Sequence, residues 1–218
     1  MVAPDASDAN VEQDSLERLV ADLGAAETGQ LVNPYACHDP ELDRPDGAAI
    51  RRANLLAYLG EHHSPALLLV GEAAGYRGCR FSGIAFTSER CLAPEQWSSR
   101  CEQGWIELSA TIVHGELSLL GLESRTLLWN AVPFHPTVDG RPLSNRTPSA
   151  AERKAGEVWL ARLIALTQPE LVVAIGQKAT KSLKAVDGGA LRVRHPARGG
   201  ATLFRAQLGD LVRECGLA

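Results

Sequence analysis

Two short, unbroken apolar runs, each ending abruptly at a glycine or an amide, most constrain how this chain can fold. Leu67–Val70 leads directly into Gly71, and Leu127–Trp129 leads directly into Asn130. Apolar runs of this length with such boundaries are typical of strands buried on both faces, as in a parallel sheet. The sequence therefore predicts an α/β protein built around a small parallel sheet.

Helical patterns alternate with strand patterns along the chain. Asp46 and Ser109 are expected to cap two helices, and Ser149 with Glu152 forms a capping box for a third. This alternation implies right-handed crossovers with helices on both faces of the sheet. Over residues 31–218 we predict a single three-layer α/β domain whose central, mostly parallel four-stranded sheet is flanked by helices. The expected strands are 66–70, 126–130, 171–175 and 190–193, and the expected helices are 11–23, 46–61, 109–120, 149–167, 177–186 and 201–215.

Charge is unevenly distributed along the chain. Residues 1–30 contain seven acids and one arginine, although the net charge of the whole chain is only −4, so the remainder is slightly basic. We expect this acidic N-terminal segment to be partly disordered or helical. Between residues 190 and 206, Arg192, Arg194, Arg198 and Arg205 follow one another without an intervening acid. Such a strip can hold phosphates, although any single surface arginine is usually just solvated.

Composition argues against several classes of protein. No apolar run approaches the roughly 18 residues of a membrane helix, and the N-terminus lacks a basic start followed by an apolar stretch. We therefore expect a soluble, cytoplasmic, monomeric protein without a membrane partner. The five cysteines are odd in number and include no Cys-x-x-Cys pair. They predict neither a disulfide framework nor a metal site, and we expect no cofactor.

Residues just past the strands are the candidates for a ligand site. The carboxyl ends of parallel strands face one crevice of an open α/β sheet. This rule brings together the glycine-rich turn Gly71–Gly75, the amide of Asn130 and the imidazole of His195. Segment 71–108 is irregular, and a loop of this length is uncommon unless it is functional. The pattern predicts a site for one small polar ligand.

Six motifs, taken in order, resemble the uracil-DNA glycosylase superfamily. The resemblance covers about residues 64–214, and it is nearest to the fourth family, the branch whose thermophilic members carry an iron–sulfur cluster. Each motif alone is a weak signal, whereas all of them in the right order make a strong one. The motifs are Gly71–Gly75, Gly83–Thr87, Leu128–Asn130, Asn145–Pro148 with Glu152, Gln168–Gly176 and His195–Ala197.

This resemblance implies hydrolysis of the bond between uracil and deoxyribose, with the base rotated out of the DNA duplex. Phe86 would stack on the base, which is worth about 1–3 kcal/mol. Asn130 would donate to O4 and accept from N3–H, a pattern that cytosine reverses. An N–H of His195 aimed at O2 would stabilise the departing uracil anion. The ordinary alternatives are a core phenylalanine, an asparagine that bonds a turn and a surface histidine.

Activation of the attacking water is open in this sequence. Ala73 occupies the position at which other members of the superfamily carry an Asp or Asn that holds the water. Glu72 is the first candidate to replace it, since a carboxylate can hold a water and offset the sugar cation; bonding to its own loop is the equal alternative. His135 is the second candidate. Backbone groups of Gly71 and Ala73 are expected to line the pocket, with Tyr76 facing C5 of the base.

Other features of the sequence refine this interpretation. Ala131–Pro136 replaces a stretch in which the iron–sulfur branch has a cysteine, so no cluster is expected. No Arg-Arg-His run is present, so the covalent self-trapping of another relative is not expected, and no lysine in the motifs could form a Schiff base. Arg146, Arg194 and Arg198 are candidate contacts to DNA phosphates.

The leading hypothesis is thus a monofunctional uracil-DNA glycosylase of base-excision repair that releases free uracil. Ala73 also motivates a non-catalytic binder of uracil-containing or abasic DNA, and a reshaped pocket would accept hypoxanthine or xanthine instead. A third hypothesis is a small domain that binds a nucleotide or an anionic metabolite on the 71–75 turn. That turn lacks the lysine of a phosphate-binding loop.

Overall fold

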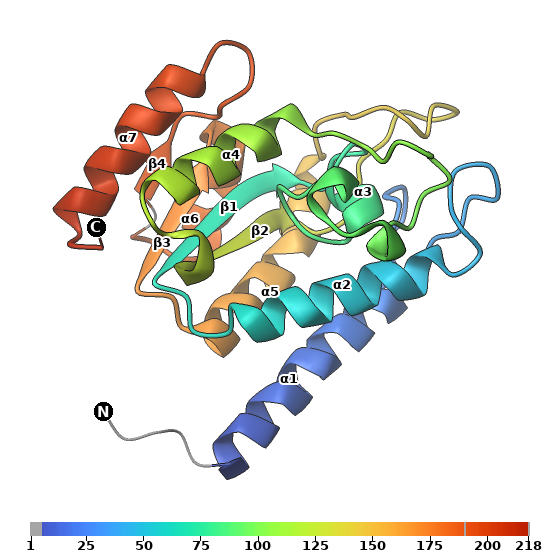
Figure 1. The fold of residues 1–218 in the computed structure, drawn as a ribbon, viewed down its shortest axis with the longest axis horizontal. Coiled ribbons are helices and arrows are strands. Elements are labelled where there is room, and N and C mark those ends of the chain that lie inside the picture. The colour runs from blue at the N-terminus through green and yellow to red at the C-terminus, as the bar shows by residue number, and fades with distance from the viewer. Residues whose placement is uncertain (1–5, 190, 218) are drawn as a thin grey trace.

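A four-stranded sheet, parallel throughout, forms the centre of the protein (Figure 1). The computed structural model describes residues 6–189 and 191–217. Strands β1 (Leu67–Ala73), β2 (Thr126–Val132), β3 (Leu171–Ile175) and β4 (Leu191–Val193) lie in the order β2-β1-β3-β4. The predicted α/β class and sheet are therefore confirmed, and residue 190, where the last strand was expected to start, lies outside the described residues.

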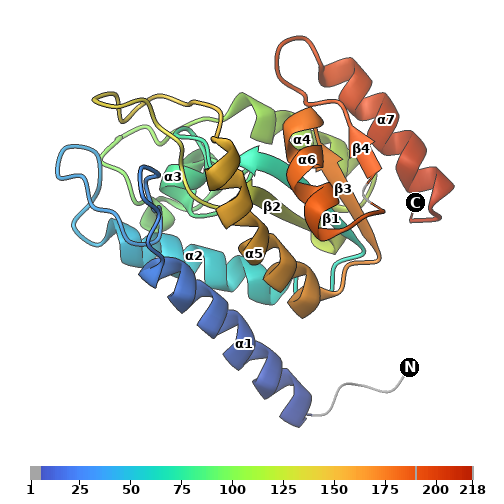
Figure 2. The same ribbon diagram turned by 180° about the vertical axis from the view of Figure 1, so that it is seen from behind.

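Helices cover both faces of this sheet, as Figures 1 and 2 show from opposite sides. They include the first helix, which is longer at both ends than the sequence predicts, and a one-turn helix that the sequence does not predict. The helices are α1 (Ala6–Ala25), α2 (Gly47–Glu61), α3 (Cys79–Ser82), α4 (Leu108–Leu119), α5 (Ala150–Thr167), α6 (Gln177–Val186) and α7 (Ala201–Glu214).

Alternate residues of β1 serve two separate cores. Leu68 and Val70 pack into a core shared with α1, α2, α5 and α6, whereas Leu67 and Leu69 pack into a core shared with α4 and α7. All four side chains are 0% exposed. Successive strand residues point to opposite faces, so an unbroken apolar run is what a strand between two helical layers requires. The result is the predicted three-layer arrangement.

Two of the predicted helix caps are wrong in detail. Asp46 occupies the N-cap position of α2, but its side chain makes no capping hydrogen bond. Helix α4 begins two residues earlier than expected, because Glu107, not Ser109, occupies its N-cap position. The Ser109 hydroxyl instead donates to the Glu107 carboxyl group at 2.5 Å. Each side chain instead contacts a residue two positions earlier in the chain, Arg44 for Asp46 and Glu107 for Ser109.

The start of α5 agrees with the prediction, whereas two strands are longer than predicted. The capping box of α5 is confirmed: the Glu152 N–H donates to the Ser149 hydroxyl at 3.2 Å, and the Ser149 N–H donates back to the Glu152 carboxylate at 2.7 Å. Strands β1 and β2 each run further than predicted, to the pair Ala73 and Val132. Among the helices of the described residues, none has the length and hydropathy needed to cross a bilayer.

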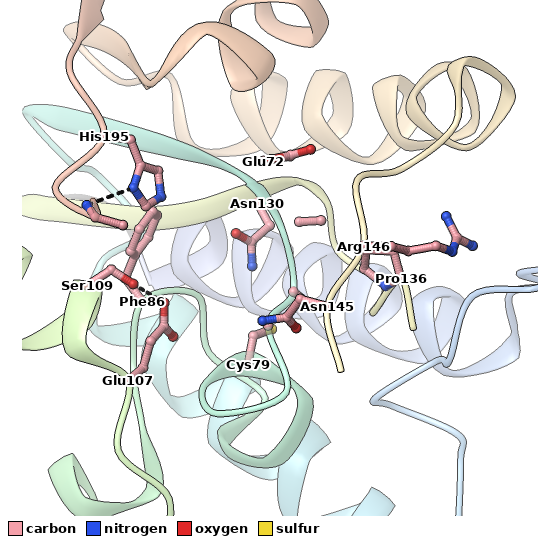
Figure 3. A pocket seen from close by; sticks show the side chains of 14 residues that line it. Glu72, Cys79, Phe86, Glu107, Ser109, Asn130, Pro136, Asn145, Arg146 and His195 are labelled. Atoms are coloured by element: carbon pink, nitrogen blue, oxygen red, sulfur yellow. Dashed lines mark hydrogen bonds between the residues drawn. The ribbon is translucent and has the colours of Figure 1, made fainter. Parts of the chain in front are cut away.

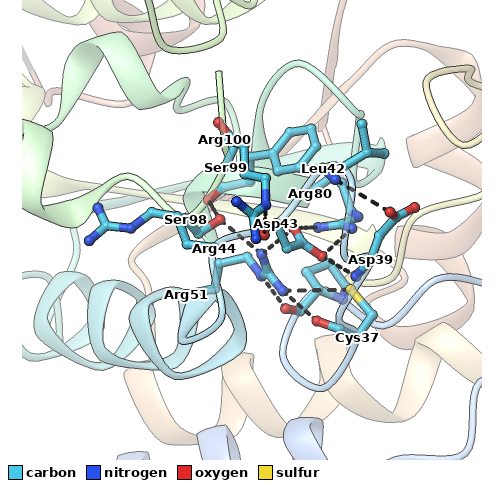
Figure 4. Close-up of polar contacts among 12 residues, drawn as sticks. Cys37, Asp39, Leu42, Asp43, Arg44, Arg51, Arg80, Ser98, Ser99 and Arg100 are labelled. Atoms are coloured by element: carbon cyan, nitrogen blue, oxygen red, sulfur yellow. Dashed lines mark hydrogen bonds and ion pairs between the residues drawn. The ribbon is translucent and has the colours of Figure 1, made fainter. Parts of the chain in front are cut away.

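A buried polar cluster fixes the irregular segments on one side of the sheet (Figure 4). Asp43 accepts hydrogen bonds from Arg80 at 2.9 Å to each of its oxygens and from Arg51 at 3.0 Å. Arg51 also donates to Ser98 at 2.8 Å. Because these residues come from the loop before α2, from α2, from α3 and from the loop near residue 98, the cluster ties four segments into one body.

Candidate active site

The carboxyl ends of β1 and β2 place a glycine directly beside an amide. Gly71 is the register partner of Asn130, and Asn130 is only 5% exposed. A Cβ atom on Gly71 would lie 2.6 Å from the Phe86 ring and 2.8 Å from the Asn130 Oδ1 atom. Only a residue without a side chain allows the ring and the amide to pack this closely against the backbone of β1 at residue 71.

Phe86 is held in a conformation that large side chains rarely adopt. Its φ angle is 49°, in the left-handed region, where a bulky residue signals a constraint imposed by the surrounding structure. The preceding turn is closed by Gly83, whose φ is 80°. His114 of α4 donates through Nε2 to the Phe86 carbonyl oxygen at 3.0 Å. Helix α4 thus helps to fix the ring against the end of β1.

His195 follows β4 and has a defined protonation pattern. The Ala197 N–H donates to its Nδ1 atom at 3.1 Å, so Nδ1 carries no proton and the neutral ring keeps its hydrogen on Nε2. Burial, together with the charges of Arg194, Arg198 and Lys178, lowers the pKa of the ring. The structure therefore favours a neutral imidazole with one N–H available to a ligand.

These three side chains line one cavity of about 280 Å³ (Figure 3). Phe86 comes from the segment after α3, Asn130 from β2 and His195 from the loop after β4. The cavity lies past the carboxyl ends of the parallel strands, where the sequence placed it. An aromatic face, an amide and an imidazole N–H can together bind a flat, polar ring.

Glu72 stands at the border between this cavity and a second one. It lines both, and its Oε1 atom is buried, makes no hydrogen bond and lies 3.5 Å from the Lys178 Nζ atom. Burial raises the pKa of Glu72, which the charge of Lys178 offsets in part. Ala73 lines the first cavity. Lys178 itself, one residue into α6, was not predicted as part of the site.

Three predicted pocket residues do not line either cavity: Gly71, Tyr76 and His135. The His135 side chain is 0% exposed, and its Nδ1 atom donates to the Ala74 carbonyl oxygen at 2.9 Å, so it braces the turn from behind. Tyr76 packs edge-on against Trp105 at 5.8 Å between ring centroids. The buried Nε2 atom of His135 has no hydrogen-bond partner within the described residues, but the ring lines neither cavity. A water-positioning role for His135 and a C5-facing role for Tyr76 therefore stay predictions.

The predicted phosphate contacts divide into two kinds. Arg146 donates from two nitrogens to the Glu152 carboxylate at 2.6 and 2.7 Å, and these hydrogen bonds lower the pKa of Glu152 to about 2. Arg146 is therefore held by Glu152, and it lines the first cavity rather than the second. Arg194 and Arg198 instead line the second cavity, of about 780 Å³, together with Arg192 and Lys178. This basic cavity adjoins the first one at His195.

Several cavity residues were missed by sequence reasoning. Glu107 and Ser109 come from the start of α4, Cys79 from α3 and Asn145 from the long loop before α5. Asn145 accepts from the Tyr76 N–H at 3.0 Å and so holds the glycine-rich turn. Burial raises the pKa of the Cys79 thiol to about 12. Of these four residues, only Asn145 could have been found from the sequence, because it lies in the motif 145–148.

An iron–sulfur cluster or other metal centre does not fit the residues present. Such a cluster needs four ligands close together, usually cysteines. In residues 6–189 and 191–217, no group of three or more His, Cys, Asp or Glu side chains is arranged to hold a metal ion. Cys79 is the one cysteine among the residues that line the first cavity.

Comparison with known proteins agrees with this architecture. The model of the family described as "Uracil DNA glycosylase superfamily" matches residues 58–209. Among solved structures, wild-type SMUG2 of Pedobacter heparinus is similar, with a TM-score of 0.67 and 14% sequence identity. The match covers 95% of this chain and 99% of that one. No curated protein matches the chain. At this identity the likeness between the two structures establishes a common fold.

Proposed function

This chain belongs to the uracil-DNA glycosylase superfamily, and we propose that it hydrolyses the N-glycosidic bond of a uracil rotated out of DNA. Membership supports a DNA glycosylase, a hydrolase that acts on damaged DNA in repair. The single observation that carries the finer proposal is the meeting of Phe86, Asn130 and His195 in one cavity. Each supplies one of the contacts that a departing uracil needs.

Recognition of the base comes first. The Phe86 ring offers a stacking face, which favours any base, and the Asn130 amide offers a donor for O4 and an acceptor for N3–H. Both are nearly buried. Gly71 allows both groups their positions, because a larger residue there would displace the ring and the amide. Cytosine carries a donor where uracil carries O4, so a fixed amide discriminates against it.

Bond cleavage then depends on stabilising the base as an anion. Water adds to C1′ of the sugar, and the electron pair of the C1′–N1 bond leaves with uracil, which takes up a proton afterwards. The Nε2–H of neutral His195 donates to O2, where negative charge develops. The lowered pKa of His195 is compatible with this role, since a neutral donor is sufficient. The products are free uracil and an abasic site.

Glu72 is the group that we propose to hold the attacking water. Its buried Oε1 atom lacks a hydrogen bond within the described structure, and a water molecule would satisfy it. Ala73 beside it has no polar group to offer. A carboxylate at the border of the cavity would also offset the positive charge that develops on the sugar.

The second cavity supplies the contact with the DNA backbone. Arg194 and Arg198 lie on its wall next to His195, so a phosphate bound there would be one step along the strand from the extruded base. Contacts of this kind position the strand without reading its sequence. They make binding strongly dependent on salt.

The proposal is tested with labelled oligonucleotides that contain a single uracil, opposite guanine, opposite adenine or in a single strand. We expect free uracil and a strand that breaks only after alkali treatment. A gel shift without release of uracil would instead indicate a binder of damaged DNA. Strand breakage without alkali would contradict monofunctional chemistry and would point to Lys178 as an attacking amine.

A further inference from the structure

Glu107 is a carboxyl group inside the base cavity that uracil does not require. It lines the cavity with Phe86 and Asn130, and its Oε1 atom accepts from the Ser109 hydroxyl at 2.5 Å. Within the described ranges, no lysine or arginine forms an ion pair with it. The Glu107 side chain is partly buried, and a partly buried carboxyl group that has no cation beside it and lines a ligand cavity is a candidate to contact the ligand.

The backbone makes room for this carboxyl group. A Cβ atom on Gly78 would lie 1.8 Å from the Glu107 Oε2 atom. No side chain could be present at residue 78 with Glu107 in its observed position. The glycine therefore permits the close approach of Glu107 to the turn that precedes α3.

The remaining edge of the base faces this side of the cavity. In the proposed orientation N1 carries the sugar, O2 faces His195, and O4 with N3–H faces Asn130, which leaves the C5 side. Figure 3 shows Glu107 on the opposite side of Phe86 from His195. Gly75 has no side chain to fill the space, and Tyr76 is turned against Trp105. The C5 side is thus open and has a carboxyl group on its wall.

We propose that Glu107 contacts the C5 side of the extruded base and favours bases that carry a hydrogen-bonding atom there. This inference rests on the proposed function and deepens it. Two groups of damaged bases share the required chemistry. Hypoxanthine and xanthine offer Asn130 the same carbonyl and N–H as uracil and place N7 beyond C5, whereas 5-hydroxymethyluracil places a hydroxyl group there.

The carboxyl group can serve either kind of base. A protonated carboxyl donates to N7, and a hydroxyl group bonds to a carboxyl in either protonation state. A cavity built to bond such an atom discriminates against a base that lacks it, because the buried group is then left unpaired. Uracil itself would leave Glu107 bonded to Ser109 alone.

The test compares kcat/KM for single U, hypoxanthine, xanthine and 5-hydroxymethyluracil lesions in one sequence context. Glu107→Ala should lower the ratio of the favoured base to uracil by at least roughly tenfold. Glu107→Gln should keep that ratio within about threefold, since an amide retains a donor and an acceptor. A loss confined to hypoxanthine and xanthine assigns N7, and a loss confined to 5-hydroxymethyluracil assigns the hydroxyl group.

Glu102→Ala is the matched control, because Glu102 is an exposed carboxylate of the same segment. A wild-type protein that releases uracil and none of the other three bases would overturn this inference alone, as would an unchanged ratio in Glu107→Ala. A wild-type protein that releases no base would overturn the proposed function as well. Thermal unfolding separates a structural role: a lower Tm in Glu107→Ala, with all four rates reduced equally, also refutes the proposal.

Discussion

Two carboxyl groups, Asp43 and Glu107, have opposite surroundings in the same small domain. Asp43 is 0% exposed and is held by both Arg51 and Arg80. Glu107 has only the neutral hydroxyl of Ser109. The first group belongs to the cluster that ties loops together, and the second faces the base cavity (Figures 3 and 4).

The presence or absence of a cationic partner distinguishes a carboxyl group that stabilises the fold from one that is available to a ligand. A buried ion pair often stabilises a protein no more than well-packed apolar side chains of the same volume would. Removing one partner of the pair is nevertheless strongly destabilising, because the other charge is left buried and unpaired. A partly buried carboxyl group without a cation, such as Glu107, is a cost that the fold carries for another purpose. We therefore expect substitutions in the first region to change stability, and substitutions in the second to change activity or specificity.

The largest expected effect is that of Asp43→Ala. Removal of this carboxylate leaves two buried guanidinium groups close together without an anion, so the free energy of unfolding should fall by about 3–5 kcal/mol. Urea unfolding measures the loss. Asp46→Ala is the control, because this exposed aspartate pairs with Arg44 only at 3.7 Å and is worth about 0.5 kcal/mol. A loss below about 1 kcal/mol in Asp43→Ala would break the comparison.

His195→Ala should have the next largest effect, and on rate only. Loss of one hydrogen-bond donor to a developing anion typically lowers kcat by about 100-fold to 1,000-fold. Single-turnover release of uracil measures it, with His63→Ala as the control, since His63 is exposed at the end of α2. Unfolding in urea should hardly change. Undiminished uracil release would remove His195 from the mechanism.

Gly71→Ala tests how tightly the cavity is built. The added Cβ atom would lie 2.6 Å from the Phe86 ring, so the ring and the amide must shift and kcat/KM should fall roughly tenfold to a hundredfold. Gly115→Ala in α4 is the matched control because nothing lies within 4 Å of its Cβ position. That control should gain about 0.5–1 kcal/mol of stability. Full activity in Gly71→Ala would mean that the spacing is not critical.

Much of the fold was predictable from local patterns. Strand 171–175 and helix 177–186 were predicted with the bounds that the structure shows, because apolar runs and a glycine turn mark them. The capping box at Ser149 was also readable. The start of helix α4 was placed two residues late, since Glu107 lacks the ordinary signature of an N-cap and its side chain lines the cavity.

The site was predictable only where strand ends determine it. Asn130 lies near the carboxyl end of β2 and His195 follows β4, so the parallel topology brings them to one edge. Glu107 and Asn145 come from irregular segments, and Asn145 reaches Tyr76 across 69 residues of sequence. Such contacts depend on how loops pack, which no local spacing encodes. The same limit explains why His135 and Tyr76, which are near the site in sequence, do not line either cavity.

The smallest expected effect concerns pH. Burial raises the pKa of Glu107, whereas for Asp43 burial is outweighed by the hydrogen bonds and charges of Arg80 and Arg51, which lower its pKa. Folded Glu107 therefore keeps its proton to a higher pH than the unfolded chain does. Its contribution to stability falls as pH rises from 4.5 through the raised value. The contribution of Asp43 has the opposite sign and is lost as pH falls below 3.8.

Urea unfolding of the wild type and of Glu107→Gln between pH 4 and pH 8 isolates this term. The variant should gain stability relative to the wild type as pH rises, because Gln does not ionise. Glu72, whose pKa is also raised, is present in both proteins and cancels in the difference. Cys79 stays neutral throughout, since its pKa is about 12. Parallel pH profiles would show that Glu107 finds a cation or water in solution, and the contrast with Asp43 would then disappear.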